Sequence, residues 1–299
     1  MKRTIRFGSR KSRLALIQTR LVMDAVTKAH PDISAELVTM DTSGDKDMRP
    51  FSDSTQAFGI KGLFTKELEG ALRNGDIDVA VHSLKDMPSQ QSEGLAIVAL
   101  SHREDPRDVL VLPNGGLSQK TDTAAGCSST RRRLQFRRLF PNISVEPVRG
   151  NVQTRLKKLD EGMFLSLILA AAGLKRLGLT DRISRYFTVD EMTPSPGQGI
   201  MACQGRAGEA YEYLDVVRDE KSELCAAAER SFSDALGGGC TSPVGAYAEV
   251  AGGRLELCGF YADEAAGIYR KGKLCGGAED ASAIGRKLAA TLLEGSAKE

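Results

Sequence analysis

A short polar turn follows an apolar run within the first hundred residues. Ser83, Lys85 and Asp86 come directly after 77–82, which reads as a buried strand. Polar residues at the carboxyl end of a parallel strand lie where α/β proteins bind ligands. A carboxylate there could stabilise a developing positive charge or move a proton. On spacing alone, an ordinary turn aspartate before Met87-Pro88 is the more common interpretation.

The strongest local charge lies in 121–160, which holds nine Lys and Arg against three acids, a net charge of +6. Ser128-Ser129-Thr130 precedes Arg131 as a helix N-cap would, and a helix N-terminus attracts anions. Arginine suits bidentate recognition of carboxylates. A carboxylate or phosphate site and a solvated basic helix face are equally compatible with this pattern. A nucleic-acid interface is disfavoured, because Phe136 is the only aromatic in 131–138 and the chain has no Trp.

The cysteines indicate free thiols, because they are widely spaced and form no C-x-x-C pair. Cys240 follows three glycines, so its thiol is accessible to a ligand in one interpretation and buried and inert in the other. Cys225, Cys258 and Cys275 fall inside helix or strand patterns, which predicts that they are buried. With only three histidines in the chain, no metal cluster is visible.

Length and composition describe an ordinary globular protein of about two domains, or three small ones. The 299 residues are 41% hydrophobic and 27% charged. A net charge of +2 excludes a protein that binds polyanions over its whole surface. No apolar run approaches the roughly 20 residues of a membrane-spanning helix, and the charged N-terminal segment is unlike an export signal. We therefore expect a cytoplasmic protein without a membrane partner.

Elements alternate in type along the first half of the chain. Residues 4–8, 12–30 and 34–40 form a strand, helix and strand pattern, followed by a helix at 62–73 and the strand at 77–82. The charged segment 102–108 interrupts this pattern, and 193–197, with two prolines and a glycine, suggests a return crossing.

From residue 222 the pattern changes to a small α+β domain. A helix to 236 precedes strands at about 243–250, 254–261 and 268–274, and a helix follows at about 280–294.

Seven runs, in order, carry a family resemblance. They are KGLFTKELE, DVAVHSLKDMP, HREDPRDV, RGNVQTRLKKLD, AGLKRLGL, PGQG and GGGCTSPVG. Together they resemble the porphobilinogen deaminase family over essentially the whole chain. The chain departs from the usual family pattern at Arg13, Ala57 and Cys127.

The resemblance implies an α/β fold. It has two periplasmic-binding-protein-like (transferrin-like) β-α domains plus a small C-terminal α+β domain with a three-stranded antiparallel sheet. We place domain 1 at 1–100 together with 198–219, domain 2 at 101–197 and domain 3 at 220–299.

The implied activity is that of a transferase in tetrapyrrole biosynthesis. Four porphobilinogen molecules condense head to tail with loss of four ammonia molecules, and water then releases hydroxymethylbilane. The implied cofactor is a dipyrromethane held by a thioether to Cys240. Each pyrrole bears an acetate and a propionate, which explains a local excess of arginine. The family implies a monomer.

The resemblance also assigns residues. Asp86 is the expected catalytic carboxylate and no metal is expected. The expected cofactor contacts are Ser83, Lys85, Ser128, Ser129, Arg131, Arg132, Arg149 and Arg155, besides Cys240. The expected substrate contacts are Arg10, Ser12, Gln18, Arg149, Arg155 and Gln198. The alternative function is a non-catalytic carboxylate-binding protein on the same scaffold, since a fold alone does not prove activity.

Overall fold

The computed structural model describes residues 2–41, 65–115, 124–237 and 243–295. The chain forms two compact units. Unit 1 comprises Met1–Arg103 and Ile200–Glu223, and unit 2 comprises Glu104–Gly199 and Leu224–Glu299. The chain therefore leaves unit 1 near the charged segment 102–108 and returns just after the 193–197 segment, where the sequence predicts the two crossings.

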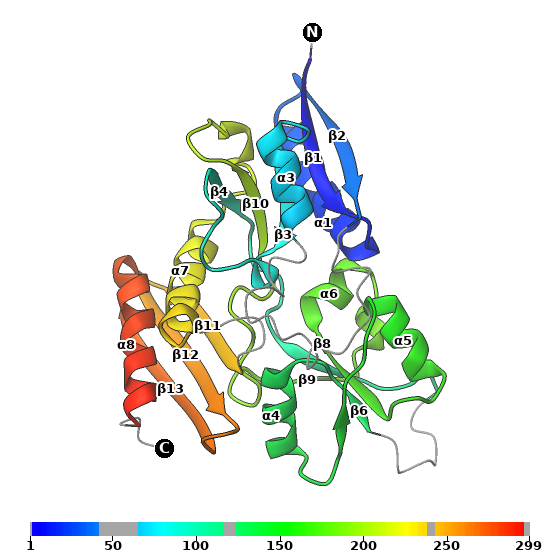
Figure 1. Cartoon of the computed structure of the whole chain (residues 1–299), viewed down its shortest axis with the longest axis vertical. Helices are drawn as coiled ribbons and strands as arrows, with labels where there is room; N and C mark the ends of the chain where they lie inside the picture. Colours follow the sequence, from blue (N-terminus) through cyan, green and yellow to red (C-terminus); the bar gives the residue numbers. More distant parts are fainter. Residues whose placement is uncertain (1, 42–64, 116–123, 238–242, 296–299) are drawn as a thin grey trace. The chain divides into compact units, whose positions relative to one another are not determined.

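Unit 1 is built on a five-stranded mixed sheet. Its strands, in order across the sheet, are β2 (Ile33–Met40), β1 (Arg3–Arg10), β3 (Val79–Ser83), β10 (Met201–Arg206) and β4 (Leu95–Leu100). β1 is parallel to β2 and β3, whereas β10 is antiparallel to both of its neighbours. A strand from the returning segment thus lies inside the sheet, beside β3 (Figure 1).

Helices cover both faces of this sheet. Successive residues of a strand point to opposite faces. Val79 and Val81 belong to the core that also contains Val22 and Val26 of α1 (Arg13–Ala29). Ala80, between those two valines, packs in the core formed with α3 (Lys66–Asn74).

Local residue chemistry sets the ends of these helices. Ser12 caps α1, since its hydroxyl accepts a hydrogen bond from the Ala15 N–H, and Pro31 follows the C-cap. Gly75 ends α3 with a φ of 74°, a left-handed conformation that glycine adopts without strain.

Unit 2 contains a second five-stranded sheet with the same arrangement. In order across the sheet its strands are β7 (Val145–Glu146), β6 (Ala125–Gly126), β8 (Ser166–Ala170), β5 (Asp108–Val111) and β9 (Arg185–Tyr186). β6 is parallel to β7 and β8, and β5 is antiparallel to its neighbours. In each sheet the fourth strand is thus antiparallel, and it is the first strand after the chain enters the unit at a crossing. The helices here are α4 (Thr130–Leu139), α5 (Val152–Asp160) and α6 (Ala171–Arg176).

The C-terminal part of unit 2 is a three-stranded antiparallel sheet with helices. Its strands are β11 (Val244–Ala251), β12 (Arg254–Asp263) and β13 (Ile268–Gly277), in that order. Phe232 of α7 (Glu220–Ala235) and Leu288 of α8 (Ala281–Glu294) share a buried core with this sheet. The described residues also include short 3-10 turns at η2 (Leu84–Asp86), η3 (Thr180–Arg182), η4 (Glu212–Leu214) and η5 (Ala278–Asp280).

The predicted fold class is confirmed: two mixed β-α sheets and a small antiparallel domain core. The division of unit 2 into a middle and a C-terminal domain stays a prediction. The five described cysteines are free, as expected, but the prediction that Cys275 is buried is wrong. The reason is that its strand, β13, is partly exposed along most of its length.

The close approach of α8 to α7 depends on Gly285. A Cβ at this position would lie 2.3 Å from the Ala228 carbonyl oxygen, which is backbone and cannot rotate away. We expect G285A to lower the free energy of unfolding by about 1–3 kcal/mol, because overpacking forces the helices apart. Gly70 of α3 has open space around it, so G70A should raise the same quantity by up to about 1 kcal/mol. Urea unfolding of both variants measures the difference, and equal effects would contradict the packing argument.

Candidate active site

The turn that carries Asp86 is fixed by buried neighbours and by backbone hydrogen bonds. Leu84 and Met87, on either side of the Lys85-Asp86 pair, are fully buried. The Met87 N–H donates to the Leu84 carbonyl at 3.0 Å, which closes the η2 turn. The Leu84 N–H donates to the Ile200 carbonyl at 3.0 Å, just before β10. Asp86 is therefore held at a defined point beyond the end of β3.

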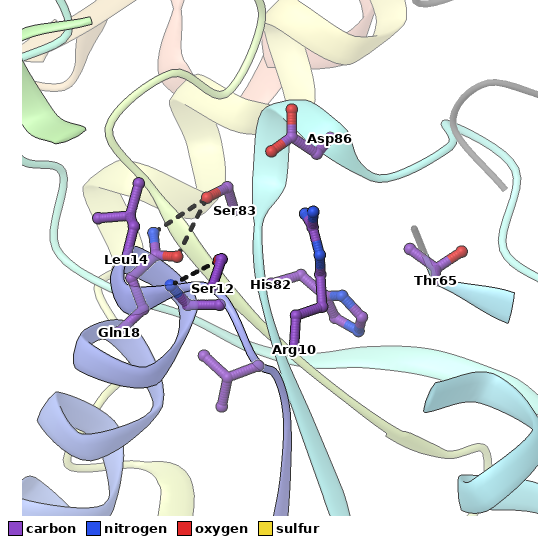
Figure 2. A pocket seen from close by; sticks show the side chains of 10 residues that line it. Arg10, Ser12, Leu14, Gln18, Thr65, His82, Ser83 and Asp86 are labelled. Atoms are coloured by element: carbon purple, nitrogen blue, oxygen red, sulfur yellow. Dashed lines mark hydrogen bonds between the residues drawn. The ribbon is translucent and has the colours of Figure 1, made fainter. Parts of the chain in front are cut away.

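A polar pocket opens beside this turn, at the carboxyl ends of the parallel strands β1 and β3 (Figure 2). Its volume is about 450 Å³, open solvent included. Five residues that the sequence analysis assigns to the site line it together: Arg10, Ser12, Gln18, Ser83 and Asp86.

Two of these side chains orient each other. The Gln18 amide nitrogen donates to the Ser83 hydroxyl at 3.0 Å, and that hydroxyl lies 3.3 Å from the Gln18 amide oxygen. The Ser12 hydroxyl is engaged within its own helix, because it accepts a hydrogen bond from the Ala15 N–H at 3.4 Å as the cap of α1. These groups form a preorganised polar wall where α1 meets β3 (Figure 2).

The charges in the pocket wall are one cation and one carboxylate. Among the lining residues, Arg10 at the end of β1 carries the positive charge and Asp86 the negative one. The Arg10 side chain points toward the side of the pocket on which Asp86 lies (Figure 2). His82 also lines the pocket, and burial lowers its pKa to about 4, so it is neutral near pH 7. It bonds to Gln204, so it is a hydrogen-bonded and buried histidine.

Lys85 and Cys240 are two further residues to which the sequence analysis assigns a role. Lys85 lies in the same turn as Asp86. Cys240 lies outside the described residues, so its role remains a prediction.

In unit 2, a buried carboxylate holds two predicted arginines. Asp108 Oδ2 accepts a hydrogen bond from Arg131 at 2.7 Å, and Asp108 Oδ1 accepts one from the Arg132 Nε at 2.9 Å. All three side chains are buried. Burial alone would raise the pKa of Asp108, but the two guanidiniums outweigh it and hold the pKa at about 2. The cluster keeps a net positive charge.

Gln198 completes this cluster. Its amide nitrogen donates to Asp108 Oδ1 at 2.9 Å and to the Pro106 carbonyl at 2.7 Å, and its amide oxygen lies 3.3 Å from Arg132. Gln198 is fully buried. Its amide therefore helps to hold the arginines.

The remaining predicted residues gather at two helix N-termini. Ser129 is the cap of α4, as predicted, and accepts the Arg132 N–H. The Ser128 hydroxyl bonds both to the carbonyl and, at 3.0 Å, to the N–H of Val148, next to Arg149. Arg155 Nε donates to the Gly150 carbonyl at 2.7 Å, at the start of α5. The Ser128–Val148 hydrogen bonds thus join the start of α4 to the segment that leads into α5.

The structure corrects one interpretation and adds one residue. Arg131 and Arg132 are buried and ion-paired, so a solvated basic helix face is the wrong description of them. Asp108 lies in the run HREDPRDV, for which the sequence analysis names no functional residue. The available signal was a carboxylate at the head of the apolar run Val109–Val111, because an acid at the start of a buried strand needs a cationic partner.

Within the described ranges, no group of three or more His, Cys, Asp and Glu side chains is placed to hold a metal ion. None of the described helices is long and apolar enough to cross a membrane.

Together, the mixed sheets, the pocket at the strand ends and the paired arginines are typical of α/β proteins that bind small anionic ligands. Comparison with known proteins identifies the family. "Porphobilinogen deaminase, dipyromethane cofactor binding domain" matches residues 5–212, and "Porphobilinogen deaminase, C-terminal domain" matches 223–294.

Full-length relatives bear the same name. The porphobilinogen deaminase of Ruminiclostridium cellulolyticum is 49% identical over 95% of this chain and 96% of its own length. That of Acetivibrio thermocellus is 48% identical over 97% of this chain and 98% of its own. Among solved structures, the BenM effector-binding domain with its effector benzoate aligns with 73% of this chain and 89% of its own at 15% identity and a TM-score of 0.42. The chain therefore belongs to the porphobilinogen deaminase family.

The buried Asp108 makes stability depend on pH in a defined direction. Its folded pKa of about 2 lies below the ordinary 3.8, so its contribution is complete above about pH 4 and is lost as the pH falls toward about 2. The expected loss is about 2 kcal/mol. D108N should remove this dependence and cost about 3–5 kcal/mol near pH 7, because it leaves buried arginines incompletely paired.

Unfolding free energies measured between about pH 5 and pH 2 test this expectation. The matched control is D160N, which breaks the more exposed ion pair with Arg182 and should cost no more than about 1 kcal/mol. A D108N protein as stable as D160N would show that the arginine pair does not depend on Asp108.

Proposed function

We propose that Asp86 is the carboxylate with which this chain condenses four porphobilinogen molecules head to tail, with loss of four ammonia molecules, before water releases hydroxymethylbilane. The family makes the chain a transferase of tetrapyrrole biosynthesis. The observation that carries the assignment of Asp86 is its place, opposite in charge to Arg10, in the wall of the polar pocket.

The chemistry suits a single carboxylate in a fixed turn. Loss of ammonia from the aminomethyl group of the substrate leaves a positive charge, which an adjacent carboxylate stabilises. Carbon–carbon bond formation then leaves a proton to be removed, and a carboxylate can accept it at Oδ1 or Oδ2. The buried anchors Leu84 and Met87 keep Asp86 in place through repeated additions.

Substrate carboxylates call for cationic and hydrogen-bonding partners. We assign Arg10, Ser12 and Gln18 to substrate binding, which their shared pocket supports. The positive charge of Arg10 attracts a carboxylate. The Gln18–Ser83 hydrogen bonds hold polar groups in place before a ligand arrives. Arg149, Arg155 and Gln198 are the further proposed contacts.

The cofactor is dipyrromethane, as the matching family domain states. The donor set fits it: unit 2 offers helix N-termini and a cluster that stays net positive, and the cofactor carries carboxylates. We propose Cys240 as the attachment point, with Ser83, Lys85, Ser128, Ser129, Arg131, Arg132, Arg149 and Arg155 holding the carboxylates. When bound, the group supplies a covalently held primer to which pyrroles are added.

The rival functions have less support. A non-catalytic carboxylate-binding protein is not favoured, because both family domains and the full-length relatives bear the enzyme's name. Nucleic acid is not a proposed partner, because Phe136 is the only aromatic residue in 131–138 and the chain has no Trp, so a base would find no stacking platform there. We also propose a cytoplasmic monomer of three domains, 1–100 with 198–219, 101–197 and 220–299. The free thiols of the described cysteines fit a reducing compartment such as the cytoplasm.

Replacement of the Asp86 carboxylate tests the catalytic assignment. We expect D86N to lower kcat by about 10²–10⁴-fold, because an amide neither accepts the proton nor balances the positive charge. The covalent cofactor mass should persist, since the attachment site is elsewhere in the chain. Hydroxymethylbilane formation is the measurement. D76N, which changes an exposed turn aspartate, should leave kcat within about twofold. Near-normal turnover by D86N would overturn the assignment.

Intact mass under denaturing conditions tests cofactor attachment. We expect the purified chain to exceed its sequence mass by two condensed porphobilinogen units, located on the Cys240 peptide. C240S should show no excess, because a hydroxyl does not replace the thiolate nucleophile. C275S removes an exposed thiol and should keep the excess. An excess that survives in C240S would place the attachment elsewhere.

A further inference from the structure

His82 belongs to a buried polar network behind the pocket wall. It shares its face of the sheet with Ala80, the face that α3 covers, and it also lines the pocket. Its Nε2 atom lies 3.1 Å from the Gln204 amide oxygen on β10. Both side chains are buried, so a hydrogen bond between them is not exchanged for water.

The network determines which way the Gln204 amide points. The Gln91 amide nitrogen donates to the Pro88 carbonyl at 3.0 Å, so the Gln91 oxygen is turned toward Gln204. The Glu69 carboxylate accepts the Ser92 hydroxyl at 2.7 Å through one oxygen and faces Gln204 with the other.

Two acceptors thus surround the Gln204 nitrogen, at 3.3 Å from Glu69 and 3.4 Å from Gln91. Its amide oxygen must therefore face His82. Because an amide oxygen only accepts, His82 Nε2 carries the hydrogen and Nδ1 is the acceptor of the ring.

The charged groups around the ring come from three elements. They are Glu69 on α3, Arg10 on β1 and Asp86 in the η2 turn. The acids favour a protonated ring and Arg10 opposes it, but burial has the largest effect and holds the pKa of His82 at about 4. The neutral ring leaves Arg10 as the cation of the described wall.

We propose that Gln204 fixes His82 as the neutral, Nε2-protonated tautomer, and that His82 is thereby a positioning residue that keeps a second positive charge out of the pocket wall that holds Asp86. An imidazolium in the same wall would compete with a substrate cation for the carboxylate of Asp86. This inference rests on the function proposed for the pocket.

The tautomer is directly measurable. With only three histidines in the chain, ¹⁵N spectra of the intact, cofactor-bearing protein can be assigned by the signal lost in H82Q. We expect His82 to keep the Nε2–H pattern from about pH 8 to about pH 5. A Nδ1–H pattern or an imidazolium in that range would overturn the proposal.

Exchanging the carboxylate of Glu69 with the amide of Gln204 tests whether a neutral His82 matters for turnover. E69Q/Q204E keeps the number of buried charges and moves the carboxylate from the Ser92 side of the network to His82 Nε2. His82 should then hold a proton near pH 7, and kcat should fall about tenfold, about 1.4 kcal/mol of activation free energy. Because a raised histidine pKa means deprotonation at higher pH, kcat should recover as the pH rises.

Rescue separates this effect from misfolding. Adding H82Q to the exchanged pair keeps a donor toward residue 204 but cannot take up a proton, so kcat near pH 7 should return to within about threefold of the unmodified protein. N74D adds a carboxylate at the exposed end of α3 and should change neither spectrum nor kcat. An imidazolium signal in E69Q/Q204E with unchanged kcat would reduce His82 to a structural role. That result would not bear on the role of Asp86, which the D86N measurement tests separately.

Discussion

The hydrogen bonding of β10 to β3 is the constraint on which the described pocket depends. A buried strand must pair its backbone groups on both edges. β3 finds one partner in β1, 72 residues earlier in the chain (Phe7 beside Val79), and the other in a strand more than one hundred residues later. The same segment supplies the Ile200 carbonyl that holds the Asp86 turn and the Gln204 side chain that bonds His82. The segment that contains β10 therefore pairs with β3, holds the Asp86 turn and supplies Gln204 to the polar network beside the pocket.

In unit 2 the antiparallel strand β5 lies between β8 and β9, as β10 lies between β3 and β4 in unit 1. There the strand begins with a carboxylate, and Asp108 is buried where it must be neutralised. Two arginines and a glutamine meet that requirement. The result is a rigid cluster whose net charge stays positive, and rigidity matters because a charged ligand is bound most tightly by groups that need no rearrangement.

Both clusters show how charge is managed in buried surroundings. Around Asp108, paired charges outweigh the cost of burial and the carboxyl stays ionised. Around His82, nearby acids do not outweigh burial, and the ring stays neutral. The difference follows from the partners: Asp108 faces two guanidiniums at hydrogen-bond distance, whereas the direct partner of His82 is an uncharged amide.

The element types, the two crossings near residues 102 and 197, the fold class and, through seven motifs, the family could all be predicted from the amino-acid sequence. Those features depend on local periodicity, caps and short runs of side chains, which neighbouring residues carry. The sequence also pointed to Arg10, Ser12, Gln18, Ser83 and Asp86, which one pocket unites. Two contacts could not be predicted in this way: the pairing of Asp108 with Arg131 and Arg132, and the hydrogen bond of Gln204 to His82. Their partners lie more than 20 and more than 100 residues apart. Only the folded sheet brings such residues into contact, because no local pattern specifies which buried groups must satisfy one another.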